Sequence, residues 1–255
     1  MGENVAELIE TGECCPKCGR PIQIGICRLL GVEKRVRVMC QCELDRRQKE
    51  RDAIDHRSRV SQIYSESGLT PRQRQATFEG WMIRDGAERA YTACTNYAEN
   101  FRVSLRHRGI GMYLYGTTGS GKTRLIHAIA NALIEKEVRV VCWNVPSLLG
   151  ALKGAYDGHG NAEDYLYAAR HANLLILDDL GSEKPSEWTR NTLYELINSR
   201  IENVTPTIVT SNWEPNSPRL LSEDVLGARL MSRLNDREVF LPVLNKATDY
   251  RRERR

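Results

Sequence analysis

Residues 116–123 read Gly-Thr-Thr-Gly-Ser-Gly-Lys-Thr, and this stretch decides the fold of the chain. It follows the apolar run 112–115 and opens a stretch of helical periodicity over 124–135. A G-x-x-x-x-G-K-[ST] pattern between a strand and a helix is typical of a phosphate-binding loop, because its glycines expose backbone amides that surround a polyphosphate together with the helix N-terminus. The sequence therefore predicts a nucleotide-binding loop.

The loop residues have separate expected roles. Lys122 is expected to reach the β and γ phosphates, and the Thr123 hydroxyl to coordinate Mg²⁺. An ordinary glycine-rich turn would need neither this Lys-Thr pair nor the preceding apolar strand. The residues predicted to bind the nucleotide are Gly116, Thr117, Thr118, Gly119, Ser120, Gly121, Lys122, Thr123 and Arg124.

Composition excludes several classes of protein. The 255 residues are 41% apolar and 27% charged, which is ordinary for a soluble chain with one moderate domain and a small appendage. The net charge of +4 is too small to identify a nucleic-acid partner. No apolar run reaches the roughly 18 residues of a membrane span, and the acidic start lacks the pattern of a secretory signal. We therefore expect a cytoplasmic protein with no membrane partner.

Six of the eight cysteines fall within the first 42 residues. Cys15-Pro-Lys-Cys18 is a knuckle in which two thiolates can face one metal ion, and Cys40-Gln-Cys42 follows a predicted strand at 35–39 and could close the site. Four sulfur ligands at this spacing predict a structural, tetrahedral Zn²⁺ site. A head of about 45 residues has little core, so the metal would contribute much of its folding free energy.

Two alternatives for these cysteines remain open. They could be free thiols, or Cys14 could replace Cys15 as a ligand at a less usual spacing. Disulfides are disfavoured because the chain shows no secretory signal. Cys27 is a spare cysteine in either arrangement.

Charge and breaker patterns divide the chain into three parts. Residues 43–60 mix basic and acidic side chains with few apolar ones, which predicts an exposed helix or tether. Ser, Gly and Pro over 65–71 mark the next boundary. The division is a head with its connector over 1–60, a linker over 61–75 and a larger body over 76–255.

The body alternates strand-like and helix-like segments. This alternation predicts an α/β fold in which helices cover a largely parallel sheet, with ligands at the carboxyl ends of the strands. The expected strands are 112–115, 138–143, 174–178, 207–210 and 239–243. The expected helices are 122–135, 146–156, 163–169, 187–202 and 225–234.

Two acidic residues end the buried strand 174–178. Asp178 is expected to hold Mg²⁺, and Asp179 stands where a general base for the attacking water usually lies. A Glu is commoner there, so hydrolysis is expected to be slow, because Asp is one methylene shorter. An apolar strand ending in Asp-Asp can also be a simple turn, but its pairing with a phosphate loop favours the nucleotide site.

Three further polar residues complete the predicted site. Asn212 follows the next strand and could lie beside the γ phosphate, where it would position the water. Arg229 and Arg233 lie one helical turn apart, so both can point from the same face of a helix. An arginine there could bind a neighbouring subunit's phosphates, although two surface arginines on an amphipathic helix would look the same.

These motifs carry a family resemblance. The phosphate loop, LLILDDLGSEKPSEW, LYELINSRIE, PTIVTSN and GARLMSRL, in this order, resemble the DnaC/DnaI group of AAA+ ATPases, the bacterial and phage replicative helicase loaders. The resemblance covers roughly residues 78–255. IstB-type transposition ATPases are close relatives with the same motifs, but the cysteine head resembles the zinc-binding amino-terminal domain of DnaI-like loaders, which favours a loader.

The resemblance implies a function for each part. Lys122, Thr123, Asp178, Asp179 and Asn212 would serve one bound ATP. Arg233 or Arg229 would reach a neighbouring subunit's nucleotide, so that ATP joins protomers. The head would bind a hexameric replicative helicase while the AAA+ body arranges protomers around single-stranded DNA.

One departure from the superfamily is visible, because only twelve residues follow Val243. They are too few for a helical lid, which leaves a second sensing arginine at Arg251 in doubt.

Three functions remain distinguishable by experiment. A helicase loader would form a complex with a hexameric helicase. An IstB-like transposition helper would coat duplex DNA and contact a transposase. A nucleotide-dependent adaptor would bind ATP as a switch, with Asp179 supporting almost no hydrolysis.

Overall fold

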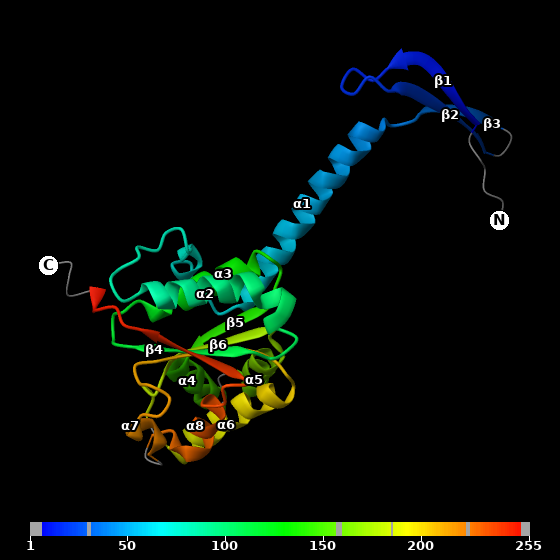
Figure 1. Ribbon diagram of the computed structural model, residues 1–255. Coiled ribbons are helices and arrows are strands. Elements are labelled where there is room, and N and C mark those ends of the chain that lie inside the picture. The colour runs from blue at the N-terminus through cyan, green and yellow to red at the C-terminus, as the bar shows by residue number, and fades with distance from the viewer. Residues whose placement is uncertain (1–6, 30–31, 157–159, 185, 223–224, 251–255) are drawn as a thin grey trace. The chain divides into compact units, whose positions relative to one another are not determined.

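The fold was obtained as a computed structural model (Figure 1). The chain divides into two compact units, Met1–Arg59 and Val60–Arg255, and each is described by itself. The residues that the structure describes are 7–29, 32–156, 160–184, 186–222 and 225–250.

The first unit contains a small antiparallel sheet in the order β1-β2-β3. Its strands are β1 Glu7–Cys14, β2 Pro21–Leu29 and β3 Val32–Arg37. Of the apolar side chains described in this unit, Cys15 and Ile22 are the buried ones. So small a core supplies little hydrophobic stabilisation, which agrees with a unit that depends on a metal.

Helix α1, Gln41–Glu66, begins in the first unit and is longer than the connector predicted at 43–60. Glu43 lies 2.6 Å from Arg46 and 3.2 Å from Arg47 across one turn. The hydrogen bond with Arg46 is the main cause that lowers the pKa of Glu43 to about 2. Such i,i+3 and i,i+4 pairs support a solvent-exposed helix.

The part of α1 from Val60 onwards and the residues after it pack in the second unit. Val60 and Leu69 are buried there, and Ile63 and Tyr64 pack against the same cluster. The division between the units falls after Arg59, within one residue of the predicted end of the head, and residues 61–75, expected to be a linker, belong to the second unit. The Ser, Gly and Pro signals lie at and just after the end of α1.

The second unit is built on a five-stranded sheet in the order β5-β6-β7-β4-β8, in which the neighbouring strands pair in parallel. All five predicted strands and all five predicted helices of the body are present, with each end within two residues of the prediction. The strands are β4 Gly111–Gly116, β5 Val140–Asn144, β6 Leu174–Leu180, β7 Thr207–Ser211 and β8 Phe240–Asn245.

Helices cover both faces of this sheet (Figure 1). Helices α2 and α3 lie on one face, and α4, α5, α6 and α8 lie on the other. The helices are α2 Glu88–Asn100, α3 Lys122–Ile134, α4 Val145–Tyr156, α5 Ala162–His171, α6 Glu187–Glu202, α7 Pro218–Leu221 and α8 Gly227–Leu234.

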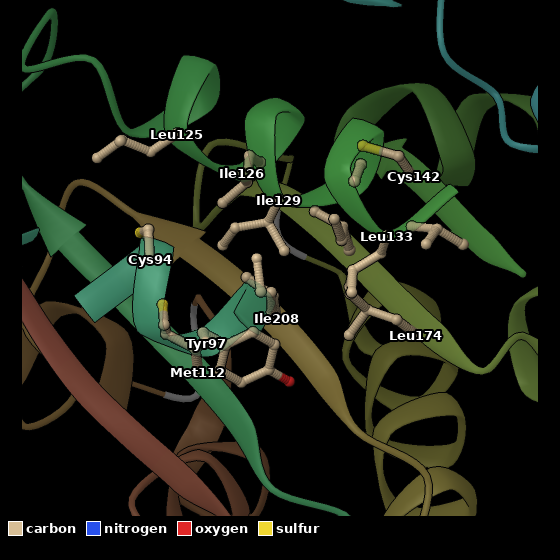
Figure 2. Packing of buried hydrophobic residues seen from close by; sticks show 14 of the residues in the cluster. Cys94, Tyr97, Met112, Leu125, Ile126, Ile129, Leu133, Cys142, Leu174 and Ile208 are labelled. Atoms are coloured by element: carbon tan, nitrogen blue, oxygen red, sulfur yellow. The ribbon is translucent and has the colours of Figure 1, made fainter. Parts of the chain in front are cut away.

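The side chains of each strand alternate between the two covering layers. In β4, Met112 and Leu114 join the cluster beneath α2 and α3, whereas Tyr113 joins the cluster on the other face. Figure 2 shows Ile126, Ile129 and Leu133 of α3 reaching towards the sheet in the first cluster. Strands buried on both faces read as continuous apolar runs, which is why the sequence shows them clearly.

Helix α2 was not predicted from the sequence, and neither was the π-helical turn Phe101–Leu105 that follows it. The buried face of α2 consists of Ala90, Cys94, Tyr97 and Ala98. Small residues such as Ala and Cys give a weak periodic signal even though they pack closely.

Arg200 is a fully buried cation within α6. Burial lowers its pKa to about 9, so the guanidinium is still charged at neutral pH. It satisfies carbonyl groups at the end of α5, where no intrahelical donor exists. Its acceptors are the carbonyls of Ala169, Arg170, Ala172 and Pro206 and the hydroxyl of Thr207, at 2.6–3.1 Å.

No helix in the described ranges combines the length and the apolar character that a membrane crossing needs.

Replacing Arg200 by alanine is expected to lower the free energy of unfolding by about 3 kcal/mol or more, because several buried acceptors lose their donor. Urea unfolding of the full chain, followed by tryptophan fluorescence, measures this, since all four tryptophans lie in the second unit. The control Arg237→Ala removes an exposed arginine and should change stability by less than about 0.5 kcal/mol. Equal effects of the two substitutions would contradict the structural role of Arg200.

Candidate functional site

The phosphate loop connects the carboxyl end of β4 to the first turn of α3. Gly116, Gly119 and Gly121 have φ angles of +151°, +77° and +97°. Side chains are disfavoured at these angles, so glycine is required for the loop to turn into the helix. A Cβ on Gly116 would also overlap the carbonyl oxygen of Asn245 on the neighbouring strand β8.

Lys122 is buried, and its side chain lies across the loop. Its ammonium group donates to the carbonyls of Gly116 and Thr117, both at 2.9 Å. It also donates to Oδ1 of Asn212 at 2.9 Å. The lysine is therefore held in the loop by oxygen acceptors.

Thr123 and Asp178 come together as the sequence predicted. The Thr123 hydroxyl lies 3.1 and 3.0 Å from the two carboxylate oxygens of Asp178. Thr210 of β7 donates to Oδ1 of the same carboxylate at 2.6 Å. A hydroxyl and a carboxylate at this spacing supply the hard oxygen ligands that Mg²⁺ prefers, so the residues present fit that ion.

Asn212 links the loop lysine to the second acidic residue of β6. Its Oδ1 accepts from Lys122, and its Nδ2 donates to Oδ1 of Asp179 at 3.1 Å. The backbone of Asp179 is left-handed, with φ of +65°, and its N–H donates to Thr210 Oγ1 at 2.9 Å. Three residues predicted separately therefore form one network at the carboxyl edge of the sheet.

The two arginines of α8 lie away from this network. Arg229 stacks over Tyr194 of α6, with its guanidinium carbon 4.5 Å from the ring centroid. Interactions with Arg233, and then with Arg229, lower the pKa of the Tyr194 hydroxyl. Both arginines are exposed, so within one chain they form a surface pair. Arg251 lies outside the described residues.

The segment that follows β8 packs against the phosphate loop. A Cβ on Gly119 would overlap the carboxylate of Asp249, so that carboxylate lies directly on the loop. The end of β8 and this segment are hydrogen-bonded to the loop. Asn245 Nδ2 donates to the Ser120 carbonyl, the Thr117 hydroxyl to the Ala247 carbonyl and the Tyr250 N–H to the Gly119 carbonyl, at 3.0–3.2 Å.

Residues before α2 also contact the loop. Arg84 donates to the carbonyl of Ser120 at 3.2 Å and to that of Thr248 at 3.1 Å. The ring of Trp81 lies against Gly121, where a Cβ would overlap it. These contacts give the loop glycines a packing role in addition to any contact with phosphate.

Several site residues were missed by sequence reasoning. Arg84 and Trp81 lack a motif and reach the loop only through the fold. Glu183 follows β6, and its buried carboxyl group accepts from the Gly181 N–H at 2.8 Å. Burial is the main cause that raises the pKa of Glu183. The sequence signal that could have identified Glu183 was its position four residues after Asp179, beyond the same carboxyl end of β6.

Two further residues that were predicted to bind the nucleotide, Thr118 and Arg124, are not part of the network described above. Arg124, which was predicted to bind the nucleotide, donates to the carbonyl of Gly80 at 2.6 Å. Thr118 is exposed.

In the first unit, Cys15, Cys18, Cys40 and Cys42 gather with all four sulfur atoms within 4.8 Å of one another. The Sγ atoms are 3.6 Å apart for the pair 15 and 42, 3.3 Å for 18 and 40, and 3.5 Å for 40 and 42. With zinc–sulfur bonds of about 2.3 Å, a tetrahedral site needs sulfur atoms roughly 3.8 Å apart, so this set fits Zn²⁺. Cys14, the alternative ligand, is exposed at the end of β1, as is Cys27 on β2.

The pKa shifts of the clustered thiols also agree with a site for a cation. Backbone hydrogen bonds, with the Lys17 amide first, lower the pKa of Cys15 to about 6. Hydrogen bonding with Cys18 is the first of the causes that raise the pKa of Cys42 to about 12. Four crowded sulfur atoms cannot all ionise without a compensating positive charge, which a divalent metal supplies.

The strand order and the site together define a P-loop protein of the AAA+ fold. A family model described as IstB-like ATP binding protein matches residues 103–255, and the chain belongs to this family.

Named proteins are similar to this chain. The replicative helicase loader DnaI of Bacillus subtilis (strain 168) is 32% identical over 169 residues, which cover 62% of this chain and 53% of DnaI. The chain thus spans about half the length of that relative. A crystal structure of the DnaC helicase loader matches with a TM-score of 0.59 and 26% identity over 69% of this chain and 100% of that chain.

DnaA from Aquifex aeolicus, solved with AMPPCP, has a TM-score of 0.57 at 23% identity, covering 71% of this chain and 52% of that chain. At this identity the likeness shows the fold alone.

Substituting Gly116 by alanine is expected to lower the free energy of unfolding by about 2 kcal/mol or more, because the new Cβ would collide with the Asn245 backbone and strain φ. Gly150→Ala in α4 is the control, since no atom lies within 4 Å of its added Cβ. That control should be neutral or gain up to about 1 kcal/mol through helix propensity. Urea unfolding compares the two, and equal stabilities would show that β4 and β8 do not pair as described.

Proposed function

We propose that this protein is an ATP-dependent helicase loader in DNA replication, which binds a hexameric replicative helicase and single-stranded DNA and hydrolyses ATP. The observation that carries the proposal is the network in which Asn212 joins Lys122 to Asp179 beside the Thr123–Asp178 pair. A protein named as a replicative helicase loader, DnaI, is 32% identical, which supports this role over other AAA+ functions. Such a protein would act in the cytoplasm.

The loop is suited to a nucleoside triphosphate. Lys122 already lies among oxygen acceptors, and phosphate oxygens would replace some of them in a bound state. Thr123 and Asp178 would hold Mg²⁺, which bridges the outer phosphates and offsets their charge. The other loop residues, with Arg124 at the end, would supply backbone amides and the helix terminus.

Hydrolysis would depend on Asp179 and Asn212. Asp179 would accept a proton from the attacking water, and the Asn212 amide would help to place that water beside the γ phosphate. Their existing contact at 3.1 Å supports a shared role. The short Asp179 side chain favours slow turnover, which suits a protein whose product is an assembly.

Arg233 and Arg229 would act on a second copy of the chain. Their exposed guanidinium groups could bind a neighbouring subunit's phosphates in a bidentate manner, and the stacking of Arg229 on Tyr194 would orient the pair. Bound ATP would then join protomers around single-stranded DNA.

The first unit would bind Zn²⁺ through its four clustered cysteines and would contact the helicase. The sulfur spacing supports the metal. The assignment of the helicase contact rests on the resemblance of this head to the amino-terminal domain of DnaI-like loaders.

A second function is favoured by one observation, because the family model that matches is named for IstB. An IstB-like transposition helper would use the same ATP site, coat duplex DNA cooperatively and contact a transposase. The cysteine cluster lies outside residues 103–255, the part that the family model matches. The match to the IstB model therefore does not include the cysteine cluster. The two proposed functions share the ATP site and differ in the partner, which is a helicase for the loader and a transposase for the transposition helper.

The full chain is expected to form a stable complex with a hexameric replicative helicase, measured by size-exclusion chromatography with light scattering. Lys122→Ala should abolish ATP binding in calorimetry, because the ammonium that meets the phosphates is removed, while the helicase complex and the zinc content persist. Lys136→Ala, in the turn that follows the end of α3, is the matched control and should bind ATP normally.

Two outcomes would overturn the assignments. Normal ATP binding by the Lys122 variant would show that the nucleotide site lies elsewhere. Cooperative coating of duplex DNA without any helicase complex would replace the loader by the transposition helper.

Zinc content gives a separate check on the head. Elemental analysis of the purified full chain should find close to a single zinc ion, and Cys18→Ser should lose it, because three sulfur ligands hold zinc much more weakly. Cys27→Ser removes an exposed cysteine of β2 and should keep the metal. Zinc retained by the Cys18 variant, or lost equally from both, would rule out the four-cysteine site.

A further inference from the structure

The strand order decides which way a triphosphate would lie on the phosphate loop. Strand β4 lies between β7 and β8. Lys122 and Thr123 meet Asn212 and Asp178 on the side of β7 and β6, so the γ phosphate and its Mg²⁺ belong there. The nucleoside would therefore extend the other way, towards β8 and residues 245–250.

Asp249 is the carboxylate at that end. It lies against Gly119, where a Cβ would overlap it, and it is partly buried. The neighbouring Tyr250 N–H donates to the Gly119 carbonyl at 3.2 Å, and the Thr117 hydroxyl donates to the Ala247 carbonyl at 3.0 Å. The segment is thus tied to the loop on both sides of the carboxylate, which holds Asp249 in place.

We propose that Asp249 recognises the ribose of the bound nucleotide, with its carboxylate accepting a hydrogen bond from a ribose hydroxyl. The site would then select ribonucleoside triphosphates over deoxyribonucleoside triphosphates. This inference rests on the ATP site proposed above. In the part of a nucleotide next to the α phosphate, the sugar hydroxyls are the hydrogen-bond donors, and a carboxylate is a strong acceptor.

A ribose hydroxyl that donates to Asp249 would also offset electrostatic repulsion. A carboxylate beside a polyphosphate is repelled, and a hydrogen bond from the ligand to that carboxylate compensates part of this cost. Arg84 offsets part of the repulsion. Its guanidinium donates to the Ser120 and Thr248 carbonyls, and its guanidinium carbon lies 5.1 Å from the ring centroid of Tyr250. The same contacts order the segment before the nucleotide binds, which lowers the entropic cost of the new hydrogen bond.

Calorimetry on the full chain with Mg²⁺ and ATP, 2′-deoxy-ATP or 3′-deoxy-ATP tests the proposal. At least one deoxy analogue should bind about tenfold more weakly than ATP, because the carboxylate then lacks its donor. Asp249→Ala should abolish the difference between ATP and that analogue, because the ribose hydroxyl then has no acceptor, whereas the loss of repulsion affects both nucleotides alike. Asp249→Asn, which keeps a neutral acceptor, should discriminate to an intermediate extent.

Glu238→Ala is the matched control, since it removes an exposed carboxylate that precedes β8, at the opposite edge of the sheet from the loop. It should preserve the full discrimination, and thermal unfolding of each variant checks that the fold is intact.

Three results would overturn the ribose assignment. The intact chain could bind all three nucleotides equally, or Asp249→Ala could keep the discrimination. Asp249→Ala could also strengthen all three by the same factor, which would mean that the carboxylate only repels phosphate. In each case ATP still binds, so the proposed ATP site survives. Failure of the intact chain to bind ATP at all would instead overturn that site, and the ribose assignment with it.

Discussion

The parallel pairing of β4 with β7 on one side and β8 on the other is the constraint on which the site depends. Parallel strands place their carboxyl ends along one edge of the sheet, and each strand contributes a different function there. Strand β4 delivers the phosphate loop, β6 delivers Asp178 and Asp179, and β7 delivers Asn212. A shift of register would separate Lys122 and Thr123 from these partners, because the contacts between them are only about one hydrogen bond long.

Within that edge, Thr210 and Asn212 connect groups that would otherwise act separately. The Thr210 hydroxyl donates to Asp178 and accepts from the backbone of Asp179, while Asn212 joins Asp179 to Lys122. A ligand that draws Lys122 away from its present acceptors therefore alters the environment of Asp179. Nucleotide binding in the loop could in this way change the orientation and hydrogen bonding of the Asp179 carboxylate, since the Asn212 amide contacts both Lys122 and Asp179.

The two units use different sources of stability. The second unit buries apolar side chains on both faces of its sheet, including Tyr113 on one and Met112 on the other. The first unit has a small sheet with little buried surface, and four of its six cysteines gather in one cluster, of which Cys15 is buried. A metal bound there would link the end of β1 to the start of α1, so metal binding and folding of the first unit would be coupled.

The sequence by itself determined the phosphate loop, the strand with its two carboxylates and most of the covering helices, because these signals are local spacings and apolar periodicities. It missed α2, whose buried face is mostly small residues. Only the tertiary structure brought Arg84 and Asp249 to the loop. The pairing of β4 with β8 places Asp249 there, and Arg84 reaches it through the carbonyls of Ser120 and Thr248. The role proposed for Arg229 and Arg233 depends on a further copy of the chain, for the physical reason that an exposed side chain acquires a role only from what it contacts.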